Sequence, residues 1–332
     1  MNILKKHSSE IKKLYWSDVS PRFEDHNESE LEIFIKNFIE CSRPRAALMT
    51  ASGHIDKIES DLLIELLQNL IVNSCEADNS FQISLYNISN VFEVLNSRTD
   101  VSKNQLATLE FMHIDSLYNS EYGIPNLEKE VEKSPFLFVQ ALALAFKRSD
   151  DKADPLELVP SKLSEKSSLA SASYYFLDKI KRIPGDRGDN DIDEQKLRDW
   201  ILEVRELCNK YARIDIGDQM IGQLLANSPI GKDDIWPCES VRCVLEEISS
   251  NEIAMGLSIG VYNSRRTAWR VEGGKQELEL ADKYRNWSRQ LAFDFPYVST
   301  ILEKIVSSYM HDAQYWEKDD KVHKRLGIYG KY

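Results

Sequence analysis

Turn-forming residues are scarce in this sequence of 332 residues, which contains only 13 Gly and 10 Pro. β-Sandwiches, β-barrels and glycine-rich nucleotide-binding loops need frequent turn residues, so this scarcity argues against all three classes. The hydrophobic fraction of 42% can bury one large core or two modest ones, and it excludes a disordered chain. The composition therefore predicts a mostly helical globular protein.

Long apolar runs are also missing. The longest covers residues 136–146, is interrupted by Gln140, and falls short of the roughly 20 residues that a membrane-spanning helix needs. The first residues, from Met1 to Lys6, continue into polar sequence and lack the apolar stretch of a secretory signal. These features predict a cytoplasmic protein with no membrane partner.

The cysteines and histidines do not follow the spacing of a metal site. The five cysteines are scattered and never spaced C-x-x-C, so we expect reduced, partly buried thiols at Cys41, Cys75, Cys208, Cys238 and Cys243. Phosphate-binding loops, dinucleotide fingerprints, nucleophile elbows and zinc-protease motifs are absent from the sequence. We therefore expect no metal and no cofactor, and the sequence favours a non-enzymatic role.

Two polar features resemble catalytic or metal-binding groups but are predicted to be structural. His113 lies within an apolar helical pattern and is expected to be a hydrogen-bonded core residue. Asp189, Asp191 and Asp193 resemble the opening of a calcium loop, but the glycine and glutamate that such a loop requires are missing. Asp193 is predicted instead to cap the helix that follows it.

Charge is distributed unevenly along the chain, whose formal net charge is −12. Residues 262–332 contain 13 Lys and Arg against 10 Asp and Glu, a net of +3, so residues 1–261 carry a net of −15. Binding to nucleic acid requires clustered cations that contact phosphates, and the acidic body disfavours it. The net positive charge of residues 262–332 leaves open a local contact with nucleic acid.

Apolar residues recur at helical spacing through most of the chain. Leu31, Phe34, Ile35, Phe38 and Ile39 illustrate the pattern, which places them on one face of a helix. The same spacing predicts helices at about 62–71, 85–95, 106–117, 136–146, 169–180, 197–207, 219–225, 241–248, 278–293 and 298–316. The predicted fold class is all-α, either an irregular α-solenoid (an antiparallel helical-repeat array) or two stacked helical bundles.

Proline and turn-rich segments suggest how the chain is organised. Pro44, Pro135, Pro237 and Pro296 are each predicted to occupy the first position of a helix, where proline presets φ without losing a hydrogen bond. Residues 149–168 are polar and charged and resemble a linker. The predicted organisation is an N-terminal helical domain over 1–148 and a C-terminal helical domain over 169–332.

Residues 256–274 form the most distinctive segment. Gly256 and Gly260 would share a helix face, which lets a neighbouring backbone approach closely. Arginine and tryptophan are the most frequent interface anchors, and arginine also pairs with carboxylate or phosphate. The predicted binding residues are Tyr262, Asn263, Arg265, Arg266, Trp269 and Arg270. The alternative is a long loop between helices whose arginines pair with the acidic body.

Several short motifs together resemble a known group of proteins. They are Arg43 to Leu48, Leu109 to Phe111, Ser134 to Val139, Ile216 to Gly222, Trp236 to Cys238, and Gly260 to Arg265 followed by Gly273 and Gly274. This pattern resembles the helical C-terminal region of large bacterial multidomain proteins, some of which look like phage-defence proteins. The resemblance covers nearly the whole chain. It implies a free-standing version of that region or a piece of a longer protein, since any enzymatic part would precede it.

The function predicted from these observations is a non-enzymatic protein-interaction module, a scaffold or sensor in a bacterial cytoplasmic system such as anti-phage defence. The expected partner is a protein. Two alternatives stay open, namely a nuclease or hydrolase whose site assembles only in three dimensions, and a nucleic-acid sensor that uses the arginine-rich residues 262–270.

Overall fold

The computed structural model describes residues 9–20, 28–72, 78, 85–159, 166–264 and 274–326. The described residues are 74% helical, and the only strands among them form one short antiparallel hairpin of β1 (Asp186–Gly188) and β2 (Asp191–Ile192). The prediction of an all-α fold is confirmed. The helices separate into two compact units, each with its own apolar core.

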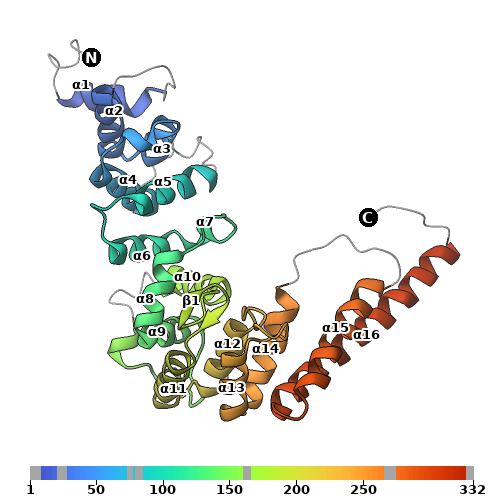
Figure 1. Ribbon diagram of the computed structural model, residues 1–332. Coiled ribbons are helices and arrows are strands. Elements are labelled where there is room, and N and C mark those ends of the chain that lie inside the picture. The colour runs from blue at the N-terminus through green and yellow to red at the C-terminus, as the bar shows by residue number, and fades with distance from the viewer. Residues whose placement is uncertain are drawn as a thin grey trace. The chain divides into compact units, whose positions relative to one another are not determined.

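Unit 1 contains the described residues up to Glu130 together with Tyr174–Lys179. Each of its helices packs against the next one along the chain, from α1 through to α7 (Figure 1). Its elements are α1 (Ser9–Asp18), α2 (Glu28–Glu40), α3 (Pro44–Ala51), the 3₁₀ turn Ile55–Lys57, α4 (Ser60–Val72), α5 (Leu85–Ser97), α6 (Lys103–Met112), α7 (Ile114–Leu117) and the first part of α8 (Pro125–Lys133).

Unit 2 contains the described residues of Val131–Ser173 and those from Ile180 onward. Within it α12 lies beside α14, and α15 and α16 form a long antiparallel hairpin (Figure 1). Its elements are α9 (Pro135–Ala145), the 3₁₀ turn Leu156–Leu158, the first part of α10 (Lys166–Lys179), β1, β2, α11 (Glu194–Lys210), α12 (Ile214–Leu225), α13 (Glu239–Ile248), α14 (Asn251–Asn263), α15 (Lys275–Leu291) and α16 (Pro296–Leu326).

The division between the units lies at Glu130 and Val131, whereas the sequence suggested a linker over 149–168. The described part of that segment, 149–159, is held firmly on unit 2. Leu158 is buried, and Asp154 forms an ion pair with Arg213, whose side chain is fully buried. Some polar residues of this linker-like segment, such as Asp154, therefore form contacts within unit 2.

Most of the predicted helix starts agree with the structure. Pro44, Pro135 and Pro296 occupy first positions of helices, as predicted. The Asp193 carboxylate accepts a hydrogen bond from the Lys196 backbone N–H at the start of α11, which confirms it as a cap. The prediction for Pro237 is wrong, because α13 begins only at Glu239 and Pro237 follows a cis peptide bond.

One structural device occurs in both units. Ser42 and Ala212 each adopt a left-handed conformation after a helix, and each is followed by a buried arginine that immediately precedes the next helix. The Arg43 guanidinium donates to the backbone carbonyl of Trp16, in the last turns of α1. The Arg213 guanidinium donates to the Phe146 carbonyl just after α9. In both cases a buried arginine ties a helix junction to the end of an earlier helix.

Candidate binding groove between α14 and α16

The position of α14 depends on its two glycines. A methyl group at Gly256 would lie 1.9 Å from the carbonyl oxygen of Gln219, and one at Gly260 would lie 2.9 Å from the Gln223 backbone. The predicted close approach at these glycines is therefore confirmed, with α12 as the neighbour. Because α14 packs against α12 along this face, its last two turns can present other side chains toward α16.

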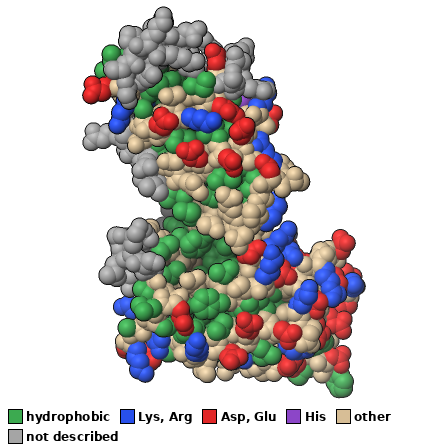
Figure 2. Space-filling model, turned by 90° about the vertical axis from the view of Figure 1, so that its left-hand side faces the viewer, with side chains coloured by type: hydrophobic (Ala, Val, Ile, Leu, Met, Phe, Trp, Pro, Cys, Tyr) green, Lys and Arg blue, Asp and Glu red, His purple; other side chains and the backbone are tan. Residues whose placement is uncertain are grey.

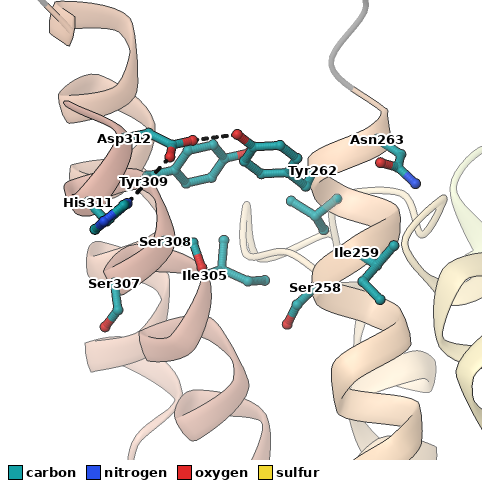
Figure 3. A pocket seen from close by; sticks show the side chains of 11 residues that line it. Ser258, Ile259, Tyr262, Asn263, Ile305, Ser307, Ser308, Tyr309, His311 and Asp312 are labelled. Atoms are coloured by element: carbon teal, nitrogen blue, oxygen red, sulfur yellow. Dashed lines mark hydrogen bonds and ion pairs between the residues drawn. The ribbon is translucent and has the colours of Figure 1, made fainter. Parts of the chain in front are cut away.

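An open groove of about 640 Å³ separates these turns of α14 from the middle of α16 (Figure 3). Its lining combines aromatic rings, aliphatic side chains, hydroxyl groups and one carboxylate. The lining residues are Ser258, Ile259, Val261, Tyr262, Asn263, Ile305, Ser307, Ser308, Tyr309, His311 and Asp312. We refer to this set as the α14–α16 groove.

A hydrogen bond crosses the groove at its upper end in Figure 3. Tyr262 extends from α14 and donates its hydroxyl hydrogen to Oδ2 of Asp312 on α16, at 2.5 Å. His311 places Nδ1 3.8 Å from the other oxygen, Oδ1, so protonation of this exposed ring would add an ion pair. The Asp312 side chain keeps only 23% of its surface exposed.

A row of aromatic rings runs from the groove into the interior of unit 2. Tyr262 stacks on Tyr309 with ring centroids 6.3 Å apart, and Tyr309 stacks on Tyr284 at 5.7 Å. Tyr284 meets Trp287 edge-to-face at 5.4 Å, and Trp287 lies 6.3 Å from Trp236. The buried Trp287 and Trp236 are anchored by indole N–H donation to the carbonyls of Asp234 and Ser228, respectively.

The structure places two of the six predicted binding residues at this groove. Tyr262 and Asn263 lie in the last turn of α14 and not in a loop between helices, and Asn263 points away from the Tyr262–Asp312 contact in Figure 3. The other four, Arg265, Arg266, Trp269 and Arg270, lie outside the described residues. Asp312 and Tyr309 were missed because they lie about 50 residues further along the chain. Tyr309 and Asp312 lie at i+4 and i+7 from Ile305, a spacing that would have grouped them on one helix face.

Buried ionisable groups elsewhere have structural partners. Glu110 is fully buried, and its carboxylate accepts hydrogen bonds from the backbone N–H groups of Asn126 and Leu127 at the start of α8. Burial raises the pKa of Glu110 against these opposing donors. His113 is buried, with Nε2 2.9 Å from the carbonyl oxygen of Leu67, and burial lowers its pKa. The prediction that His113 is a hydrogen-bonded core residue is confirmed.

Three further observations concern metal binding, membrane crossing and surface charge. In the residues that the structure describes, His, Cys, Asp and Glu side chains form no group of three or more that could hold a metal ion. None of the described helices combines the length and apolar character that crossing a bilayer requires. On the face of the molecule shown in Figure 2, Lys and Arg side chains are interspersed with Asp and Glu.

Together the fold and the groove define an all-α protein with an open, mixed-polarity groove at the end of one helix. Comparison with protein-family models, with curated proteins and with solved structures finds no match to this chain.

Proposed function

We propose that this chain is a protein-interaction module, a scaffold or sensor, and that it binds a partner protein in the α14–α16 groove. The observation that carries the proposal is the lining of that groove. Aromatic side chains are enriched at protein interfaces, where a few anchors supply most of the affinity, and the groove exposes the Tyr262 ring beside Ile259. The groove is also open, which suits a side chain or short segment of a larger molecule.

The setting of this module is part of the proposal. The resemblance to bacterial phage-defence proteins suggests a bacterial cytoplasmic system, and the successive packing of helices in unit 1 supports an irregular α-solenoid. Arg265, Arg266, Trp269 and Arg270, which follow Ser264 in the sequence, stay a sequence-based prediction of partner contacts. A protein partner is favoured over nucleic acid here, because the groove contains the Asp312 carboxylate, which repels phosphate.

Site-specific photo-crosslinking tests this function. A photoreactive residue would replace Ser308, an exposed groove residue, and in a matched variant would replace Thr300, which is exposed on the same helix outside the groove. Both side chains donate a hydrogen bond to the carbonyl four residues earlier, so the two substitutions remove the same kind of contact from α16. We expect a protein from the source cells to be crosslinked at 308 and not at 300.

The captured protein is then purified and its affinity measured directly. Replacing Ile259 with Asp in the groove should weaken that affinity at least tenfold while leaving the circular dichroism spectrum unchanged. Equal crosslinking at 308 and 300, or an affinity that ignores the Ile259→Asp change, argues against the groove as the binding surface. A crosslinked nucleic acid in place of a protein would favour the sensor alternative.

A further inference from the structure

The two oxygens of the Asp312 carboxylate differ in their hydrogen bonding. Oδ2 accepts the Tyr262 hydroxyl, whereas Oδ1 has only His311 Nδ1 near it, at 3.8 Å, which is beyond hydrogen-bond distance. Among the described residues, none donates a hydrogen bond to Oδ1. With 77% of its side chain withdrawn from solvent, this carboxylate is only partly hydrated, so a cationic N–H donor that reached Oδ1 would gain a charge-assisted hydrogen bond.

The surfaces next to Asp312 fit the rest of a cationic side chain. Ile259, which is 37% exposed, lines the groove and offers aliphatic contact to the methylene stem of a lysine or arginine. Tyr262, 46% exposed, adds an aromatic ring close to the carboxylate, and such rings attract cations. The hydroxyl of Ser308 lies on the same wall and can bond the backbone of a visiting segment.

We propose that the α14–α16 groove docks a basic segment of the partner protein, with a lysine or arginine of that segment paired to Oδ1 of Asp312. This inference rests on the proposed function and names the chemistry of its partner. Charge complementarity supports it on two scales. Locally the groove offers one carboxylate, and the chain as a whole carries a net charge of −12, which accelerates encounters with a basic partner.

The test uses the full chain and a random dodecapeptide library displayed on phage. Peptides are selected on the wild-type chain and then synthesised, and their affinities are measured for wild type, Ile259→Asp, Asp312→Asn and Asp319→Asn. Asp319 is the matched control, since it also lies on α16 beside a histidine, His323 at 3.2 Å, but outside the groove. Retained helical circular dichroism and melting temperature show that each variant folds.

We expect the selected peptides to be enriched in Lys and Arg. Asp312→Asn should weaken them at least tenfold, while Asp319→Asn should leave their affinity unchanged. Replacing the critical Lys or Arg of a peptide with Met should cause the same loss on the wild-type chain and little further loss on Asp312→Asn. Such non-additivity identifies the two groups as direct partners.

Three results would overturn the inference. If Asp312→Asn binds the peptides as wild type does and Ile259→Asp does not, the groove docks proteins but not through a cation, and the proposed function survives alone. If neither variant changes affinity, both proposals fail together. If the Asp312→Asn effect disappears when Arg265, Arg266 and Arg270 are all replaced by Ala, the carboxylate serves an arginine of this chain and not one of a partner.

Discussion

The buried guanidinium of Arg213 forms two hydrogen bonds with the carboxylate of Asp154, at 2.7 and 2.8 Å. The remaining donors of Arg213 reach backbone carbonyls, including that of Phe146 after α9. A single side chain at the start of α12 thus secures both the end of α9 and the polar segment that follows it. Because the Arg213 guanidinium is buried, its partners depend on it for their hydrogen bonds.

Replacing Arg213 with Met tests this dependence. The variant leaves Asp154 and several carbonyl groups without their donor, and breaking a buried ion pair in this way destabilises proteins by about 3–5 kcal/mol. We expect a loss of that order in the free energy of unfolding measured by urea denaturation. Arg187→Met is the control, since Arg187 is more than half exposed and should leave the unfolding midpoint unchanged. A midpoint for Arg213→Met equal to that of wild type would contradict the anchoring role.

Replacing Glu110 with Gln tests the buried carboxylate that caps α8. Burial raises the pKa of Glu110 above its ordinary 4.5, so the folded chain holds this proton more tightly than the unfolded chain does. The stability contributed by this group therefore falls as the pH rises from 4.5 through the raised pKa, and it is constant above that. We expect the free energy of unfolding of wild type, relative to Glu110→Gln, to decrease with pH in this window. An increase would show that the hydrogen-bond donors to the Glu110 carboxylate outweigh burial.

His113 should make stability depend on pH with the opposite sign. Burial lowers its pKa below the ordinary 6.5, so its contribution is complete above pH 6.5 and is lost as the pH falls through the lowered pKa. His113→Gln keeps a side-chain N–H for the Leu67 carbonyl but does not titrate. Melting temperatures recorded from pH 5 to 8 should fall on the acid side for wild type and stay flatter for the variant.

Gly256→Ala should force α12 and α14 apart. The added methyl group would lie 1.9 Å from the Gln219 carbonyl oxygen, which belongs to rigid helix backbone. Overpacking of this kind costs about 1–3 kcal/mol and sometimes more, and we expect a loss in that range by urea denaturation. Ser258→Ala, two residues further on, should change stability by less than about 0.5 kcal/mol. Equal losses for the two variants would show that the close approach is not required.

Helical periodicity predicted most helices because their apolar faces are continuous, as in Leu31 to Ile39 of α2. It gave no predicted helix over 251–263, although Gly256 and Gly260 were expected to share a helix face. In the structure the two glycines are what allows α14 to pack on α12, so tertiary contact overrides propensity. The segment at 149–159 was misjudged for a related reason, since its polar groups meet a buried arginine that is distant in sequence.

The candidate groove could be predicted only in part. Tyr262 and Asn263 stood out by residue type within one segment, and both line the groove. Asp312 gave no such signal, because an acidic residue on a charged helix is ordinary until Tyr262 is brought to it across 50 residues. Local patterns reveal one wall of a groove, whereas the opposite wall depends on how α16 folds back along α15.

The aromatic row from Tyr262 to Trp236 gives the groove an optical readout. Tyrosine excitation passes efficiently to nearby tryptophans, and each ring in the row lies within 6.3 Å of the next. A ligand that displaces Tyr262 or changes its surroundings should therefore alter the emission of Trp287 and Trp236, which are shielded from solvent. Titrations of the unlabelled protein in a fluorimeter can thus follow occupancy of the groove, and Tyr262→Leu, which removes the first ring, provides the corresponding blank.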